Sequence, residues 1–396
     1  MRLPVKWSRY NLLFKSENSG YMLYNSLSST FARLDDDTYH ELARMRDAPG
    51  NLDCARDPGF FAQLRLAKVL VTDGEECSLL NIIRMKKRQA SHDTARLGLT
   101  IAPTLACNFD CTYCYQRHKG LVRMNDRTED EILDFARHFR NTRILAITWF
   151  GGEPLLEFNR IRSLTARLRR LNLHFKASMI TNGYLLTEPV IRNLEPLGIG
   201  EIQITIDGSE ATHNRRRRLT NGCETYSPIM NNLEKLLTLW PGQAVLRINV
   251  DESNMDEYTR THKDLSKRFE GKRIRIRPGI VQDAPETCRG NFCELAPRRE
   301  TEFFLKQYRE RDIAPPKFFP FAGSSSCMAR RVAGFLIGPE GELYKCWHDL
   351  GVKERVVGSI YQDKPWNNDL LARYAVVVDI LDDPDSQPEL CATLAQ

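Results

Sequence analysis

The pattern of hydrophobic and polar positions changes near residue 95. Between residues 10 and 34, short apolar runs are broken by Ser and Gly, which predicts a small β-meander. Residues 36–46 and 59–70 carry apolar side chains at roughly helical spacing, and the polar, basic stretch that follows suits a helix or linker. We therefore predict a small N-terminal α+β domain over residues 1–94.

From residue 95 the chain alternates between short apolar strands and longer amphipathic segments. Such alternation predicts βα units with a parallel sheet. About six strands can be counted between residues 97 and 280, fewer than the eight of a complete barrel. We predict an α/β fold with a partial (β/α)6 TIM-like barrel over residues 95–290. A third domain over residues 291–396 opens with a helix and then shows a hairpin at residues 335–347.

Composition narrows the class of protein. The net charge of +6 is a mild excess of Lys and Arg, so we expect no nucleic-acid partner. No apolar run of about 18 residues or more is present, and the first residues lead into polar sequence, so we expect a cytoplasmic protein with no membrane partner. Eleven cysteines in such a chain favour metal or redox chemistry over a disulfide framework.

Cys107, Cys111 and Cys114 are bunched as C-x3-C-x2-C directly after a predicted strand. Thiolates are the usual ligands of iron–sulfur clusters, and three from the protein leave one iron open to a substrate or cofactor. Structural zinc usually takes four ligands in two close pairs, and no second pair lies nearby in the sequence. His118 is the one neighbouring candidate for a fourth ligand. An iron–sulfur cluster is the favoured interpretation. The isolated cysteines Cys54, Cys77 and Cys223 are expected to be small buried hydrophobes.

This spacing, with an aromatic residue before the last cysteine, resembles the signature of the radical S-adenosylmethionine (SAM) superfamily. Four further segments at predicted strand ends resemble motifs of that family in the same order. They read GGEP, SMITNG, IQITIDG with a following His213 and Arg216, and LRINVD. The resemblance implies that SAM is bound by Tyr113, Gly151, Gly152, Glu153, Pro154, Thr181, Asn182, Thr205, Arg247 and Asn249.

The resemblance also implies the chemistry. A [4Fe-4S] cluster on the three cysteines would reduce SAM to methionine and a 5′-deoxyadenosyl radical, which abstracts hydrogen from the substrate. The electron would come from a reductant such as flavodoxin or ferredoxin. Glycines at 151, 152 and 183 are expected to allow close backbone approach to the ligand.

Two charged features near the fourth predicted strand each have two interpretations. Asp207 lies at the strand end and faces the expected cavity, so it is a candidate catalytic acid or base or a substrate contact. A helix or turn cap is the alternative. The four arginines at 215–218 either bind an acidic leader peptide or form a solvated face, and the solvated face is favoured.

The last third resembles the opening of a SPASM domain, the extension in which peptide-modifying radical SAM enzymes hold auxiliary clusters. The resemblance rests on C-x13-G-x4-C over residues 327–346, on the hairpin, and on the Val-Gly-Ser-Ile turn that follows. The later cysteine series of that domain is missing, and Leu394 stands where a cysteine would fall. Either the gene is truncated, or this is a reduced version with at most one auxiliary [4Fe-4S] cluster. Its candidate ligands are Cys327, Cys346, Cys391, Cys288 and Cys293, of which the last two are equally well read as free thiols.

Together these features resemble the maturases of ribosomally made peptides, so the expected substrate is a precursor peptide or protein. The reaction would be a crosslink, an epimerisation or a side-chain oxidation. The first 80 or so residues resemble a peptide-recognising module that pairs with an extended leader, and a structural cap on the barrel is the alternative. An anaerobic sulfatase-maturase-like oxidase that forms formylglycine and a non-catalytic iron–sulfur redox sensor are the competing functions.

Overall fold

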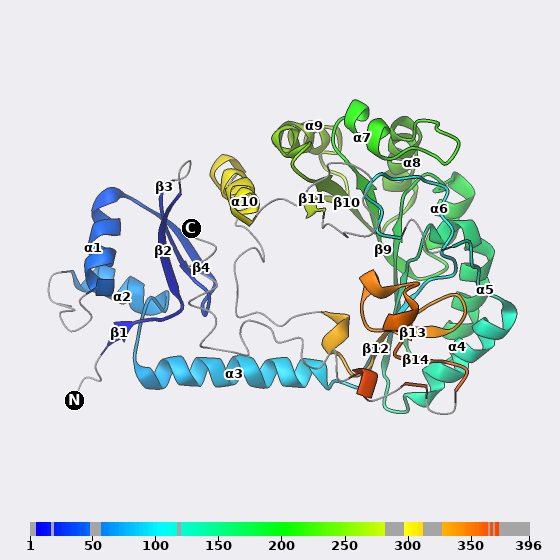
Figure 1. Cartoon of the computed structure of the whole chain (residues 1–396), viewed down its shortest axis with the longest axis horizontal. Helices are drawn as coiled ribbons and strands as arrows, with labels where there is room; N and C mark the ends of the chain where they lie inside the picture. Colours follow the sequence, from blue (N-terminus) through cyan, green and yellow to red (C-terminus); the bar gives the residue numbers. More distant parts are fainter. Residues whose placement is uncertain are drawn as a thin grey trace. The chain divides into compact units, whose positions relative to one another are not determined.

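The computed structural model describes residues 5–16, 20–47, 57–116, 120–281, 297–311, 327–362, 365–366 and 369–371. They fall into two compact units (Figure 1). The first contains the described residues up to Ser91 together with α10 (Pro297–Arg311). The second contains those from His92 to Val281 and from Cys327 onward.

A three-stranded antiparallel sheet forms the centre of the first unit and confirms the predicted meander. Its strands are β2 (Asn11–Ser16), β3 (Gly20–Asn25) and β4 (Thr30–Leu34). Buried and less buried positions alternate along β2, because a strand that covers a core on one face has a period of two. The remaining elements are β1 (Lys6–Trp7), α1 (Asp36–Asp47), α2 (Pro58–Leu66), β5 (Leu70–Val71) and α3 (Asp73–Ser91).

The second predicted helix is wrong at its end. The structure ends α2 at Leu66, and Lys68 then takes a positive φ of 61°, which a continuing helix does not allow. The fully buried Leu70 and Val71 instead pair with β1 as a short antiparallel strand. These two residues are apolar because they are buried in a strand, and not because they continue the apolar face of the helix.

Six parallel strands form the main part of a nine-stranded sheet in the second unit, in the order β11-β10-β9-β8-β7-β6. This confirms the predicted α/β architecture with six βα units. The strands are β6 (Arg96–Ile101), β7 (Ile144–Trp149), β8 (His174–Thr181), β9 (Ile199–Ile206), β10 (Gln243–Val250) and β11 (Ile274–Ile280). The helices between them are α4 (Asp126–His138), α5 (Phe158–Arg169), α6 (Glu188–Leu194), α7 (Glu210–Arg216), α8 (Tyr226–Leu239) and α9 (Tyr258–Arg268). The 3-10 turns η1 (Pro154–Glu157) and η2 (Met255–Glu257) precede α5 and α9.

The predicted C-terminal hairpin extends this same sheet. Strand β12 (Gly334–Ile337) is fully buried and pairs in parallel with β6, while β13 (Glu342–Tyr344) and β14 (Gly358–Ser359) add antiparallel neighbours. The short 3-10 turns η3 (Met328–Arg330), η4 (Trp347–Asp349) and η5 (Lys353–Arg355) flank the hairpin.

The contacts of the last third therefore divide it differently from the domain limits drawn from the sequence. Helix α10 belongs to the first unit, where Leu305 packs with Leu12, Phe14 and other side chains of the small sheet. The Ser16 hydroxyl also donates a hydrogen bond to Glu302 at 3.1 Å. Sequence periodicity identifies a helix or hairpin but not the sheet against which it packs.

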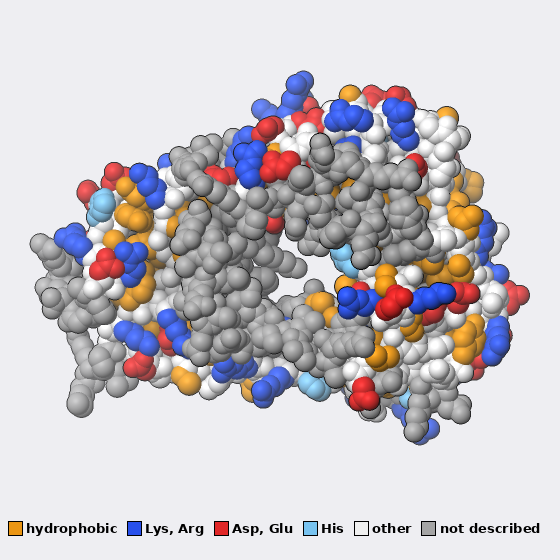
Figure 2. Space-filling view, viewed as in Figure 1, with side chains coloured by type: hydrophobic (Ala, Val, Ile, Leu, Met, Phe, Trp, Pro, Cys, Tyr) orange, Lys and Arg blue, Asp and Glu red, His pale blue; other side chains and the backbone are white. Residues whose placement is uncertain are grey.

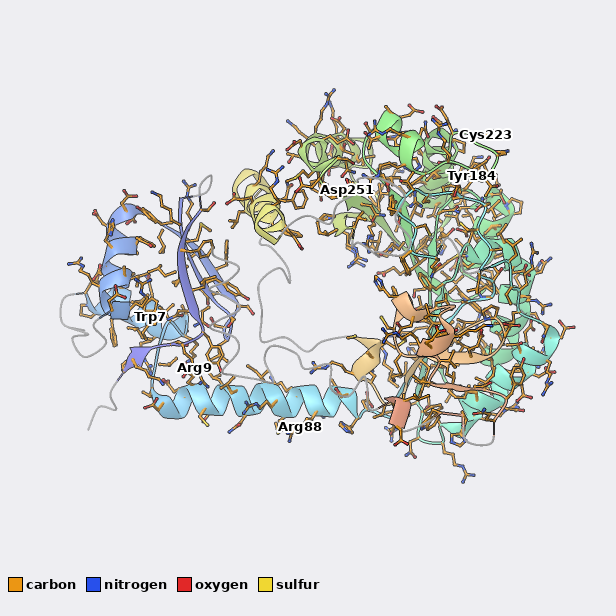
Figure 3. All side chains as sticks on the ribbon, in the orientation of Figure 1. Trp7, Arg9, Arg88, Tyr184, Cys223 and Asp251 are labelled. Atoms are coloured by element: carbon orange, nitrogen blue, oxygen red, sulfur yellow. The ribbon has the colours of Figure 1, made fainter. Side chains whose placement is uncertain are left out.

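The carboxyl ends of the parallel strands gather at one edge of the sheet, as the fold requires. Tyr184 and Asp251, labelled in Figure 3, mark the ends of β8 and β10 at this edge. On the face in Figure 2, basic and acidic side chains are interspersed over the described surface. Among the described residues, none of the helices combines the length and apolar character needed to cross a membrane.

Candidate functional site

Cys107, Cys111 and Cys114 lie in the loop between β6 and α4, here called the cysteine loop (residues 102–116 and 120–125). Its two ends are joined by hydrogen bonds, since the Leu105 amide donates to the Val122 carbonyl at 2.9 Å. Cys111 is buried and the other two thiols are half-buried. The loop is therefore a closed structure at the carboxyl end of the first barrel strand.

The middle of the cysteine loop forms a short antiparallel ribbon with the segment that leaves α7, here called the Cys111 ribbon (residues 108–112 and 216–220). Phe109 and Leu219 form the β-bridge at its centre. The Asp110 amide donates to the Arg218 carbonyl at 2.8 Å, and the Thr220 amide donates to the Asn108 carbonyl at 3.0 Å. The ribbon fixes the backbone that carries Cys111.

Gly151 and Gly152, directly after β7, pack against the segment that leads into Cys107. A β-carbon on Gly152 would lie 2.2 Å from the Ala106 carbonyl oxygen, and one on Gly151 would lie 2.4 Å from the Thr104 oxygen. Gly151 also has a φ of 124°, which favours glycine. The close approach expected here is thus to the backbone of the cysteine loop.

Glu153 joins three segments of the site. Its fully buried carboxylate accepts hydrogen bonds from the Thr181 hydroxyl at 2.7 Å and from the Asn182 amide at 2.7 Å, both at the end of β8. It also accepts from the Leu155 amide at 3.0 Å, within the turn that begins at Pro154. Burial raises the pKa of Glu153, and these hydrogen bonds oppose the rise. The side chain thus ties the end of β7 to the end of β8.

Asn182 continues this link to the cysteine loop. Its side-chain amide donates to the Asn108 side-chain oxygen at 2.8 Å, and the same nitrogen lies 4.0 Å from the Cys107 sulfur. Asn108 was not predicted from the sequence. Its place between the first two cysteines is the only sequence signal that points to it.

A buried polar group, here called the Tyr113 cluster, contains Tyr113, Asp207, Arg216, Arg217 and Asn249. The Tyr113 hydroxyl donates to Asp207 at 2.7 Å and accepts from Arg217 at 2.8 Å and from Asn249 at 2.9 Å. Arg216 pairs with Asp207 at 2.8 Å and with Asp251 at 2.8 Å. Arginine and aspartate side chains are thus hydrogen-bonded around Tyr113, the residue that precedes the last cysteine.

The structure corrects two expectations about this cluster. Asp207 is fully buried and paired, so it does not face an open cavity, and Ser209 rather than Asp207 caps α7. Burial raises the pKa of Asp207, while Arg217 and Arg216 lower it. Arg216 and Arg217 are 0% and 7% exposed, so the solvated-face interpretation is wrong for both. Oppositely charged partners from other strands compensate the cost of burying them.

Arg247 and Thr205 lie side by side on β10 and β9, where the strand register pairs them. The Arg247 guanidinium donates to the Asn249 side-chain oxygen at 2.8 Å, and burial lowers the pKa of Arg247. It extends over Gly279 on β11, where a β-carbon would lie 1.9 Å from Nε. Gly279 was overlooked, although a glycine inside a strand often marks a close approach of this kind.

The donor set of the cysteine loop suits an iron–sulfur cluster. Burial raises the pKa of Cys107 and of Cys111 to about 12, the neighbouring thiols add to the rise, and Arg217 opposes it. The three sulfurs therefore act on one another electrostatically. In the part of the chain that the structure describes, no three His, Cys, Asp or Glu side chains form a group that could hold a single metal ion. Thiolates are the usual ligands of iron–sulfur clusters, so three soft sulfur ligands on one loop fit such a cluster.

The second group of cysteines is only partly described. Cys327 is exposed and Cys346 is half-buried, and they precede η3 and η4 on the two sides of the hairpin. Burial raises the pKa of Cys346, and the nearby Cys327 contributes to the rise. The other candidate ligands, Cys288, Cys293 and Cys391, lie outside the described residues, as do His118 and Cys54. Cys77 and Cys223 are exposed, so the prediction that they are buried is wrong.

Comparison with protein families decides what this arrangement belongs to. Residues 101–265, from the end of β6 to α9, match the family model of the radical SAM superfamily. Residues 101–265 form a radical SAM domain. All of the cysteine loop, the Cys111 ribbon and the Tyr113 cluster lie within the radical SAM domain.

Known proteins resemble more of the chain than this domain. A serine-type anaerobic sulfatase-maturating enzyme of Klebsiella aerogenes is 27% identical over 278 residues, covering 63% of this chain and 66% of that protein. The structure of anSMEcpe with bound AdoMet and Cp18Cys peptide matches with a TM-score of 0.59 at 18% identity, covering 76% of this chain and 95% of that one. Streptococcus suis SuiB bound to precursor peptide SuiA matches with a TM-score of 0.54 at 14% identity, covering 94% and 90%.

At such low identity the two structural matches show the fold alone. This chain also spans only 39 to 52% of the length of three other curated relatives. They are two uncharacterized proteins of Methanocaldococcus jannaschii and a probable GTP 3′,8-cyclase of Archaeoglobus fulgidus. The radical SAM domain is therefore shared by relatives with different names, and the domain by itself does not fix the substrate.

Proposed function

We propose that this chain is a radical SAM enzyme that modifies a side chain of a ribosomally made peptide or protein. The observation that carries the proposal is the joining of three separate motifs into one site. Glu153 links the turn after β7 to the end of β8, and Asn182 links that end to the cysteine loop. A loop needed only as a surface turn would not require such a buried arrangement.

In this proposal Cys107, Cys111 and Cys114 hold a [4Fe-4S] cluster with one open iron. When bound, the cluster supplies the electron that cleaves SAM to methionine and a 5′-deoxyadenosyl radical. The chain's part is to orient SAM and to exclude water from its reacting end. The turn from Gly151 to Pro154 presents backbone groups to the amino group of SAM, and Glu153 holds that turn in place.

The remaining candidate contacts lie on the neighbouring strands. Arg247 supplies a positive charge that suits the carboxylate of SAM, and Asn249 and Thr205 supply polar groups for the ribose. Asn249 also holds the Tyr113 hydroxyl, and Arg247 is oriented by Asn249. These contacts would place SAM between the cysteine loop and the ends of β9 and β10.

The role of Asp207 as a catalytic acid or base stays a prediction. Its carboxylate lies 2.7 Å from the Tyr113 hydroxyl and 2.8 Å from Arg216, and the residue is fully buried. These contacts favour a positioning role, in which Asp207 holds Tyr113 next to Cys114. A group without access to substrate has no proton to exchange with it.

Two observations support a peptide or protein as the substrate. The matched structures of anSMEcpe and SuiB each contain a bound peptide, and the match to SuiB covers 94% of this chain. The small sheet of the first unit also has an edge strand, β4, whose residues are only partly buried. An extended peptide can add a strand to such an edge.

A formylglycine-forming oxidase is the second candidate, because the sulfatase-maturating relative aligns over 63% of this chain. That function normally needs a full set of auxiliary cluster ligands. Within the described residues only Cys327 and Cys346 are available for one, so at most one auxiliary [4Fe-4S] cluster is proposed. We therefore rank this candidate second.

The test is reductive cleavage of SAM. The protein is reconstituted anaerobically with iron and sulfide and reduced with dithionite, and 5′-deoxyadenosine is measured by chromatography. Wild type should form it, and Cys107→Ala, Cys111→Ala and Cys114→Ala should not. The matched control Cys223→Ala changes an exposed thiol, labelled in Figure 3, and should behave as wild type. Wild type that carries its cluster but forms no 5′-deoxyadenosine would favour the redox-sensor alternative.

A further inference from the structure

The Cys111 ribbon places one arginine directly opposite the middle cysteine of the cluster loop. Phe109 and Leu219 form a bridge, and three residues further along each segment the Thr112 amide donates to the Arg216 carbonyl at 3.1 Å. This antiparallel register sets Cys111 opposite Arg217. Residues opposite each other in such a pair project to the same face, with β-carbons about 4.5–5.5 Å apart.

The side chain of Arg217 lies on that face and reaches from Phe109 to Tyr113. Its guanidinium lies 5.6 Å from the centre of the Phe109 ring, and NH1 donates to the Tyr113 hydroxyl at 2.8 Å. Phe109 lies two residues before Cys111 in the ribbon, so its side chain shares the face of Cys111. Tyr113 lies in the turn that follows, which the hydrogen bond from the Cys114 amide to the Cys111 carbonyl closes. The guanidinium is thus held on the Cys111 side of the ribbon, between Phe109 and the Tyr113 hydroxyl.

Arg217 is 7% exposed, and its Nε atom makes no hydrogen bond with any described residue. Its nearest carboxylate is Asp207, whose oxygen lies 3.9 Å from Nε. Asp207 is itself engaged by Arg216 at 2.8 Å. A buried cation with an unused donor and a shared counter-ion is incompletely neutralised by the protein alone. Additional negative charge beside it would complete the pairing.

The neighbouring arginines differ from Arg217 in this respect. Arg216 is paired with Asp207 and with Asp251, whereas Arg215 and Arg218 are exposed. Only the second and third of the four side chains are buried. The Arg216 guanidinium lies over the Tyr113 ring at 5.0 Å, whereas Arg217 is the one set opposite Cys111 in the ribbon. Arg215 and Arg218 can therefore serve as exposed control positions for Arg217.

We propose that Arg217 is a positioning residue of the cluster, and that its fixed positive charge beside Cys111 makes one-electron reduction of the bound cluster easier. This inference rests on the proposed function. The step consists of one electron passing from a reduced one-electron donor to the cluster, so the donor is oxidised and no bond is formed or broken. The cluster gains one unit of negative charge, which an adjacent cation stabilises. Net charge near the cluster is one of the terms that set its reduction potential.

The experiment is a redox titration of the reconstituted protein, followed by electron paramagnetic resonance of the reduced cluster. Four proteins are compared, namely wild type, Arg217→Gln, Arg217→Lys and the exposed control Arg215→Gln. At a fixed donor potential, the ratio of reduced to oxidised cluster in Arg217→Gln should be about tenfold lower than in wild type, since a charge a few ångströms away acts with that strength. Arg217→Lys should recover most of the loss, and Arg215→Gln should match wild type.

Cluster content and circular dichroism separate this effect from misfolding. An Arg217→Gln protein with full cluster content and the wild-type midpoint potential overturns the inference. If the Gln variant does not assemble a cluster, the Lys variant decides: a full cluster with a near wild-type potential supports the proposal, and a folded Lys protein without a cluster overturns it. A wild-type protein that never assembles a cluster refutes the proposed function itself, whatever the variants do.

Discussion

The two cysteine regions of the second unit are built in different ways. The three thiols of the cysteine loop lie on one short segment, whose backbone is bonded to the segment after α7 and packs against two glycines after β7. Cys327 and Cys346 instead lie on the two sides of a hairpin, and Cys327 is exposed. The remaining ligands proposed for that second site lie outside the described residues.

This difference shows what the backbone contributes to a cluster site. In the cysteine loop, hydrogen bonds and close packing fix the backbone that carries the three thiols. In the hairpin region the described residues supply a sheet and two thiols, and a cluster there would need further ligands from elsewhere in the chain. The two regions do touch, since the His348 ring stacks on Tyr115 with 4.7 Å between centroids.

The largest expected effect is the loss of SAM cleavage when a cysteine of the cysteine loop, but not of the hairpin region, is replaced. Cys111→Ala should abolish both the radical cluster and 5′-deoxyadenosine, because three ligands are the minimum for this site. Cys346→Ala should lower the iron content and leave 5′-deoxyadenosine formation measurable. Iron and sulfide analysis together with chromatography checks both variants. Loss of all activity in both would mean that the regions form one functional unit.

The next effect tests whether the glycine packing supports the cysteine loop. Gly152→Ala should lower the free energy of unfolding by about 1–3 kcal/mol, because the new methyl group meets backbone that cannot move aside. Gly200→Ala is the matched control, since a β-carbon there meets nothing within 4 Å. Chemical denaturation followed by circular dichroism measures both. Equal stabilities would show that the loop adapts to the methyl group.

A smaller effect is expected at the carboxylate that joins β7 to β8. Glu153→Gln keeps the size of the side chain but replaces one acceptor oxygen with a donor group. That group faces either the Asn182 amide or the Thr181 and Leu155 donors. The free energy of unfolding should fall by about 1–2 kcal/mol, and weaker SAM binding should accompany it. Glu188→Gln is the control, because that carboxylate forms an exposed pair with Arg192 on α6. Equilibrium dialysis and denaturation give the two quantities, and an unchanged affinity for SAM would restrict Glu153 to a structural role.

The smallest effect concerns the contact between the two regions. A double-mutant cycle with Tyr115→Leu and His348→Ala should give a coupling energy of about 0.5–1.5 kcal/mol, the usual contribution of a stacked ring pair. Denaturation of the four proteins provides the measurement. A coupling energy of zero would mean that the hairpin region and the cysteine loop are energetically independent.

Sequence patterns predict the local parts of this molecule well. The six parallel strands follow from alternation, and the family of the domain follows from five motifs in order, because each motif is one contiguous segment. The burial of Arg216 and Arg217 was missed, since it depends on Asp207, Asp251 and Tyr113 from three other segments. A run of four arginines contains no sign of such distant partners.

The packing of the last third was missed for the same reason. The sequence indicates a helix and a hairpin there, but the pairing of Gly334 with Gly98 is determined only when β6 is present. The role of Gly151 and Gly152 is a related case. The sequence pattern predicts a close backbone approach at these two glycines. The structure shows that the approach is to the carbonyl oxygens of residues 104–106.

The pairing of β12 with β6 also bears on how the protein is made. During synthesis, β6 leaves the ribosome early. The edge of β6 that pairs with β12 stays unpaired until residues 334–337 have been made, after the whole radical SAM domain. Contacts this distant in sequence form slowly, because a long loop must close first. Until then the strand that leads into the cysteine loop has an open edge that can pair wrongly. We therefore expect iron loading of the nascent chain to follow completion of the hairpin.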